Sequence, residues 1–145
     1  MDQSFIELNR ASTERIRRMA RSLSDEQMQH PVGQFWTVSI VMAHLAFWDR
    51  RVLYVLDMTE QDGKLFIPEI DIFVNDLSLP LWEAIPPRQA ARIAIDTALK
   101  LDARLEAYPE ALLDEIYAYN PRWVNRSLHR GEHLDEAEAA LKQKA

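Results

Sequence analysis

The sequence contains no cysteine, and only 3 of its 145 residues are glycine. Without cysteine, the chain has no disulfide, no thiolate ligand for a metal and no cysteine nucleophile. The scarcity of glycine argues against a β protein with many tight turns. The absence of cysteine is compatible with a reducing compartment, and we expect a cytoplasmic protein.

The chain also lacks an excess of basic charge and any long apolar run. Its net charge is -6 at pH 7, so we expect no nucleic-acid partner. The longest apolar stretch, Ile40 to Trp48, is interrupted by His44 and is far too short to cross a bilayer. The N-terminal residues have neither the basic patch nor the apolar segment of a signal peptide, so we expect no membrane partner.

Apolar residues are nevertheless abundant, at 48% of the chain, which is enough for a proper core. The length is typical of a single domain, so we predict one domain over residues 1–145. Helical periodicity dominates, and patterns typical of strands are almost absent. We therefore predict an all-α four-helix bundle. Its helices are expected over residues 4–22, 37–57, 87–108 and 121–141.

The connection from Thr59 to Pro87 is much longer than a turn requires. Glycine and prolines interrupt it, yet it is too apolar for a disordered linker. We expect an ordered crossover with a short helix near Ile72 to Leu77, which either walls a pocket or only covers one end of the core. A long crossover allows the third helix to run parallel to the second, in up-down-down-up order. The second and fourth helices are then antiparallel neighbours, and residues 110–119 form a connector with at most one helical turn.

Histidines are the most informative polar residues of the sequence. His44 lies in the middle of an apolar helical face, where an unpaired imidazole is costly to bury. His129 and His133 are four positions apart, so their rings can converge on one ion. With His44 from the facing helix, they provide three nitrogen ligands, and three ligands plus water are typical of a reactive metal site. Imidazole suits zinc, nickel, iron or copper.

Spacing alone leaves other interpretations open. His44 can be a core histidine that bonds a carbonyl or a water. His129 and His133 can be surface residues beside Glu132 and Glu136. The string from His129 to His133 has no glutamate directly after its first histidine, which excludes an HExxH metalloprotease.

Charged residues near this pair of histidines are candidates for catalysis or substrate binding. Arg126 and Arg130 lie on the last helix, close in angle to the edge that carries the two histidines. Arginine binds carboxylates in a bidentate manner. The alternative is that both arginines form surface pairs with Glu132 or Glu136. These two glutamates are also the candidates for acid-base chemistry, and a small molecule is the expected substrate.

Several short motifs resemble the DinB-like superfamily, which includes DinB/YfiT-type proteins and the N-terminal domain of mycothiol-dependent maleylpyruvate isomerase. The motifs are Trp36-Thr37-Val38, His44-Leu45-Ala46 and Trp48-Asp49, followed by His129, Glu132, His133, Leu134 and Glu136. The resemblance covers nearly the whole chain and departs at Phe35, where glycine is expected. It implies an up-down-down-up bundle, often dimeric, with one metal ion held by His44, His129 and His133.

The resemblance also implies a function. Characterised members are often transferases or isomerases that use mycothiol, bacillithiol or glutathione, and others are hydrolases. We therefore expect a divalent metal, zinc or nickel, that activates a low-molecular-weight thiol. The alternatives are a hydrolase with activated water and a non-catalytic, stress-related bundle that binds a metal or ligand. Trp48 and Asn75 are candidates for the substrate pocket, and the aromatic residues Tyr117 and Tyr119 would suit a homodimer interface.

Overall fold

A computed structural model describes residues 1–143 of the chain. Its elements are α1 (Phe5–Ser22), α2 (Asp25–Met28), β1 (Pro31–Val32), β2 (Trp36–Thr37), α3 (Val38–Asp62), α4 (Phe73–Glu83), α5 (Pro87–Glu106), α6 (Glu110–Tyr119), the 3-10 turn η1 (Pro121–Trp123) and α7 (Ser127–Lys142). The protein is all-α, as predicted, apart from the short antiparallel pair of β1 and β2. The predicted domain end at residue 145 lies outside the described residues. Within residues 1–143, no helix combines the length and apolar character that crossing a bilayer requires.

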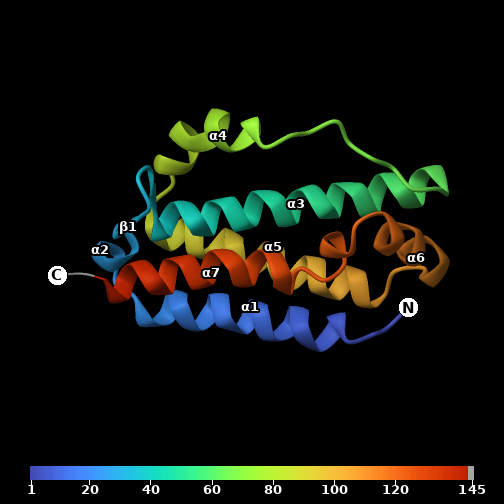
Figure 1. Ribbon diagram of the computed structural model, residues 1–145, viewed down its shortest axis with the longest axis horizontal. Coiled ribbons are helices and arrows are strands. Elements are labelled where there is room, and N and C mark those ends of the chain that lie inside the picture. The colour runs from blue at the N-terminus through green and yellow to red at the C-terminus, as the bar shows by residue number, and fades with distance from the viewer. Residues whose placement is uncertain (144–145) are drawn as a thin grey trace.

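The four long helices α1, α3, α5 and α7 lie side by side (Figure 1). The most extensive packing joins α3 to α5, whose buried face carries Ala90, Ala91, Ala94 and Ala98. Helix separation depends on the side chains at the contact, so these alanines let α3 approach closely. The resulting scaffold holds α7 beside α3, and both helices carry the histidines.

The core has two apolar clusters with polar residues between them. One cluster centres on Val41, Leu45 and Leu134, and the other on Leu56 and Leu105. Between them lies a set of buried polar side chains that we call the polar layer: Asn9, Thr13, Asp49, Asp102, Arg126 and Arg130. Buried charges are tolerated only when they are paired, and in the polar layer Asp49 and Asp102 form ion pairs with Arg126 and Arg130.

Helix α3 is longer than the sequence analysis predicted. Its start agrees, because the Thr37 side chain caps the helix by accepting from the backbone N–H of Ile40 at 3.2 Å. The predicted end near residue 57 is wrong, and the helix continues to Asp62. Gly63 ends it with φ 71°, a left-handed conformation that glycine adopts without a steric penalty.

The crossover contains more helix than predicted. Helix α4 extends to Glu83 despite Pro80, and it packs along the outside of α3 (Figure 1). Residues 110–119, predicted as a connector with at most one helical turn, are helical throughout. This segment is helix α6, because Leu113 and Ile116 recur at helical spacing and are both buried in the second cluster.

Helix α7 begins later than predicted, at Ser127 rather than near residue 121. Residues near 121 form only the short turn η1, which Asn120 caps by accepting from the N–H of Arg122. The start of α7 is capped from another helix. Asn9 of α1 accepts from the N–H groups of Arg126 at 2.8 Å and Ser127 at 3.2 Å.

Candidate metal centre

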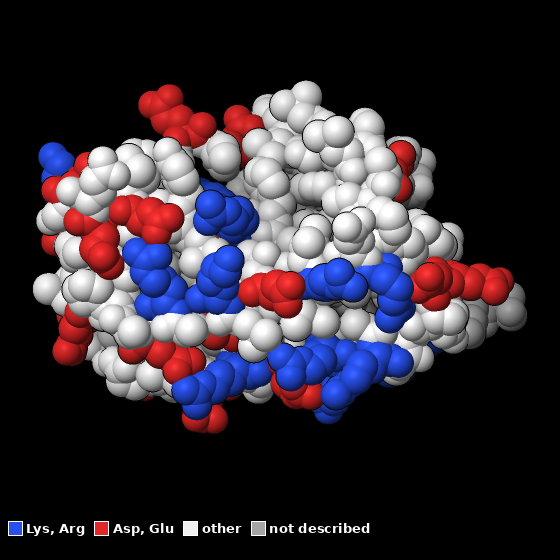
Figure 2. Space-filling model, turned by 180° about the vertical axis from the view of Figure 1, so that it is seen from behind, with Lys and Arg blue, Asp and Glu red and all other residues white. Residues whose placement is uncertain are grey.

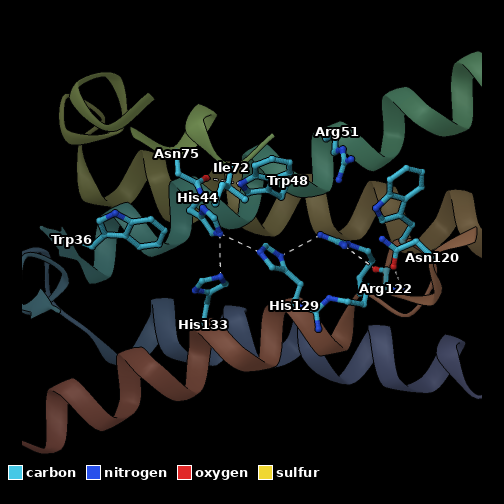
Figure 3. A pocket seen from close by; sticks show the side chains of 12 residues that line it. Trp36, His44, Trp48, Arg51, Ile72, Asn75, Asn120, Arg122, His129 and His133 are labelled. Carbon is cyan, nitrogen blue, oxygen red and sulfur yellow. Dashed lines mark hydrogen bonds between the residues drawn. The ribbon is translucent and has the colours of Figure 1, made fainter. Parts of the chain in front are cut away.

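Three histidines converge between α3 and α7. The Nε2 atom of His44 lies 3.1 Å from Nε2 of His129 and 3.1 Å from Nε2 of His133. One ligand atom from each ring lies within 4.8 Å of the other two. Figure 3 shows the three rings pointing toward one another, with His44 above and the other two on α7 below.

The donor set fits a metal ion better than it fits a hydrogen-bond network. Nε2 of His44 has a single lone pair or a single proton, so it cannot pair well with both neighbouring nitrogens at once. A divalent ion instead accepts one lone pair from each ring. Three imidazoles leave further coordination positions free, which is the arrangement of a site that binds an exchangeable ligand.

The environment keeps two of these rings neutral. Burial, reinforced by the nearby charge of His133, lowers the pKa of His44 to about 3. Burial and the guanidinium of Arg126 also lower the pKa of His129 far below its usual range. Neutral imidazole is the form that binds a metal. At neutral pH the rings of His44 and His129 are therefore ready to bind an ion without first losing the extra proton of an imidazolium.

The three rings differ in the surroundings of their outer nitrogens, and Nδ1 of His44 and Nδ1 of His133 are buried without a hydrogen-bond partner in residues 1–143. The carboxylate of Glu136 lies 3.5 Å from Nδ1 of His133, a close approach without a hydrogen bond. The Asn75 side chain lies beside His44 and favours its protonated form (Figure 3). Arg126 donates from Nη2 to Nδ1 of His129 at 3.2 Å. A guanidinium only donates, so Nδ1 of His129 is the acceptor in this contact.

Tryptophans cover one side of the histidines. The ring of Trp36 lies 4.7 Å from that of His44 and 5.9 Å from that of His133, between centroids. Trp82 meets His44 edge-on at 5.6 Å. This wall excludes water from one side of the centre and strengthens electrostatic interactions there.

A pocket of about 320 Å³ adjoins the centre. That volume is within the range of small-molecule sites. The lining residues are Trp36, His44, Trp48, Arg51, Ile72, Asn75, Asn120, Arg122, Trp123, Arg126, His129 and His133. No aspartate or glutamate is among them. Trp48 and Asn75, which the sequence analysis named as pocket candidates, both line it, and Trp48 donates from Nε1 to Oδ1 of Asn75 at 2.8 Å.

The two predicted acid-base candidates lie outside the pocket lining. Glu132 is exposed and accepts from both terminal nitrogens of Arg122, at 2.9 and 3.0 Å. This ion pair lowers the pKa of Glu132. Glu136 is also exposed, and its contact is with the outer nitrogen of His133.

Arg126 and Arg130 do not form the surface pairs considered as an alternative, and that interpretation is wrong. Both belong to the polar layer, where Asp49 accepts from Nε of Arg126 at 2.8 Å and from Nε of Arg130 at 3.0 Å. Arg130 is fully buried and also donates to Asp102 at 2.9 Å. Only Arg126 reaches both the polar layer and the pocket, so it links the buried charges to His129.

Sequence reasoning missed Arg51, Asn120 and Trp123 as pocket residues. Arg51 follows His44 by seven positions and Trp48 by three, so helical spacing already places it on the same face of α3. Trp123 falls within the final helix predicted over residues 121–141, whereas the structure places it in the turn η1. Its position over Arg51 depends on the break before α7, which local sequence does not reveal.

Comparison with known proteins gives one finding. The family model described as the DinB superfamily matches residues 8–135. This range includes all three histidines. No curated protein and no solved structure gives a match to the chain.

Proposed function

Because the chain belongs to the DinB superfamily, we propose that it is a metal-dependent enzyme that uses a low-molecular-weight thiol. His44, His129 and His133 hold one divalent ion, zinc or nickel, and the reaction is transfer of the thiol to a small electrophile or its isomerisation. The observation that supports this most strongly is the convergence of three imidazoles at one end of a small-molecule pocket.

An ion of this kind, when bound, would lower the pKa of a coordinated thiol. The thiol would then be a thiolate nucleophile at neutral pH. The chain's own residues hold and shield the ion. Glu136 and Asn75 lie close to the rings of His133 and His44, where a carboxylate and an amide could orient the rings once an ion is bound. Trp36 and Trp82 exclude water from one side.

The acidic residues of the region favour a thiol over activated water. A hydrolase needs a group that takes a proton from water or gives one to the leaving group. No carboxylate lines the pocket, and Glu132 is engaged by Arg122. A thiolate bound to a metal needs no such base, and the chain has no cysteine that could provide the sulfur.

The proposal includes the finer description of the fold and its assembly. In Figure 1, α1 and α7 run in one direction and α3 and α5 in the other, which supports an up-down-down-up four-helix bundle. Exposed apolar side chains on the crossover, including Ile72 at 76% and Leu77 at 77%, would suit a homodimer. We also propose a cytoplasmic location, where low-molecular-weight thiols are reduced.

Cobalt substitution tests the proposed chemistry. Cobalt(II) binds zinc-type ligands, and a thiolate on it produces a strong near-ultraviolet charge-transfer band. We expect this band when a simple thiol such as 2-mercaptoethanol is added to the cobalt-loaded protein, and no band with ethylene glycol. The His129→Ala variant should lose the band. A protein that binds cobalt with no spectral response to any thiol would refute thiol activation.

A further inference from the structure

We infer that the pocket selects ligands that carry a carboxylate, and that Arg51 is the residue that binds it. The inference deepens the proposed function, on which it rests for the reacting end of the ligand. The evidence that Arg51 binds a carboxylate is independent of the proposed function and comes from the end of the pocket opposite the histidines.

Arg51 is held in place without an acidic partner. Its guanidinium carbon lies 4.5 Å from the ring centroid of Trp123 and 5.2 Å from that of Trp48. Its Nε is shielded from solvent and has no hydrogen-bond partner, and no carboxylate of residues 1–143 forms an ion pair with it. Burial, with the nearby charge of Arg126, lowers the pKa of Arg51, so an incoming anion would relieve an unfavourable environment.

The other arginines of the pocket are already paired. Arg122 donates two hydrogen bonds to Glu132, and Arg126 donates one to Asp49. On the face seen from behind in Figure 2, bands of basic side chains likewise alternate with acidic ones. Arg51 differs from these residues, because its charge is directed into a cavity whose lining contains no acidic residue, in a chain of net charge -6 (Figure 3).

The arrangement favours a carboxylate over a phosphate. The rings of Trp48 and Trp123 lie against the guanidinium and leave its edge for a ligand. The edge of a planar guanidinium matches a planar carboxylate in a bidentate contact. A phosphate dianion would require more uncompensated positive charge than one arginine provides.

The distance between the two ends limits the ligand. Seven helical positions separate His44 from Arg51, which corresponds to about 10 Å along α3. A molecule that places its sulfur at the histidines and its carboxylate at Arg51 is therefore of the size of a mercaptocarboxylic acid or a short cysteine-containing peptide. Its body lies against Trp48, and Asn120 provides an amide near the carboxylate end.

Binding to the metal-free protein tests this inference separately from the thiol chemistry. The probes are hexanoate and hexanamide, which share shape and differ in charge, and tryptophan fluorescence reports binding because two tryptophans flank Arg51. We expect hexanoate to bind at least about tenfold more tightly than hexanamide, since one charge-assisted hydrogen bond provides about that factor. Equal binding of the two probes, or tighter binding of inorganic phosphate than of hexanoate, would overturn the inference.

Two variants assign the effect to one side chain. Arg51→Gln should reduce hexanoate binding to the level of hexanamide. Arg50→Gln, a neighbour on α3 that is exposed and lines no described pocket, should bind as wild type does. An Arg51→Gln protein that retains the preference for hexanoate would refute the role of Arg51. If that variant does not fold, the comparison of probes on wild-type protein still decides the carboxylate preference.

A comparison of 6-mercaptohexanoate with 6-mercaptohexanol on the cobalt-loaded protein then tests whether one ligand occupies both ends of the pocket. We expect the thiolate band at a concentration about tenfold lower for the mercaptocarboxylate, and no such advantage in Arg51→Gln. A band of equal strength and concentration dependence for both thiols would support the metal chemistry and refute the carboxylate subsite. Absence of a band, with hexanoate still preferred by the metal-free protein, would refute the thiol chemistry and leave the subsite standing.

Discussion

Asp49 is the residue on which the buried charges depend most, so replacing it with asparagine tests the account of the polar layer. It is 1% exposed and accepts from both Arg126 and Arg130, at 2.8 and 3.0 Å. In the Asp49→Asn variant, Arg130 keeps Asp102 as its acidic partner. Arg126 then has no acidic partner within residues 1–143.

The expected cost follows from this arrangement. Removing one partner of a buried ion pair costs about 3–5 kcal/mol. Because Arg130 keeps its bond to Asp102, we expect the lower end, about 3 kcal/mol. At the size of this chain, that loss corresponds to a decrease of roughly 6–12 °C in melting temperature. Arg126 also contacts His129, so metal affinity should decrease by about tenfold.

The assay is urea unfolding of the metal-free protein, followed by circular dichroism, with Asp57→Asn as the matched control. Asp57 lies on the same helix, and its ion pair with Arg104 at 2.6 Å is on the surface. Surface pairs contribute at most about 1 kcal/mol. If Asp49→Asn loses no more stability than Asp57→Asn, the buried pairing does not stabilise the fold as we argue.

Three further substitutions test other parts of the structure. Trp48→Phe removes the 2.8 Å bond to Asn75 that ties α4 to α3, so limited proteolysis should cleave residues 64–72 about fivefold faster; an unchanged rate would show that the bond does not hold the crossover. Burial raises the pKa of Tyr108 to about 12, so wild-type protein should lose stability as the pH rises from about 10 to 12, where the unfolded chain releases the proton first. Tyr108→Phe loses the bond to a backbone carbonyl of α3, at a cost of about 1 kcal/mol at pH 7, and should not show that alkaline decrease in unfolding curves. Ala98→Leu overfills the fully buried contact of α5 with α3 and should cost about 1–3 kcal/mol in urea unfolding, whereas a neutral result would mean that the helices can separate without penalty.

Local patterns predicted the parts of the fold that local chemistry determines. Thr37 caps α3, and apolar periodicity identifies the four long helices, because both depend on residues within a few positions of one another. The late start of α7 depends on Asn9, which lies more than a hundred positions away in the sequence and caps the helix from α1. A long-range cap of this kind cannot be predicted from the residues around Ser127.

The site, like the fold, has features that neighbouring residues predict and features that depend on distant residues. The spacing of His129 and His133 predicts that their rings share one face. The predicted packing of the second and fourth helices adds His44 as their partner, and the resemblance implies the same three ligands. The burial of Arg130 was missed, although the sequence contains a hint of it. Arg130 lies four positions before Leu134 and so on the apolar face of α7, but its charge led to a surface interpretation. Only the tertiary structure shows that Asp49 and Asp102 neutralise it there.

The most direct test of the metal centre is elemental analysis of untagged protein after incubation with zinc or nickel and removal of excess ion. We expect about one metal ion per chain in wild-type protein and in His30→Ala, whose histidine lies apart from the centre and bonds the backbone of Ala140. The His44→Ala, His129→Ala double variant, folded by circular dichroism, should contain none. A wild-type protein without metal, or a double variant that retains it, would contradict the assignment of the three histidines as ligands.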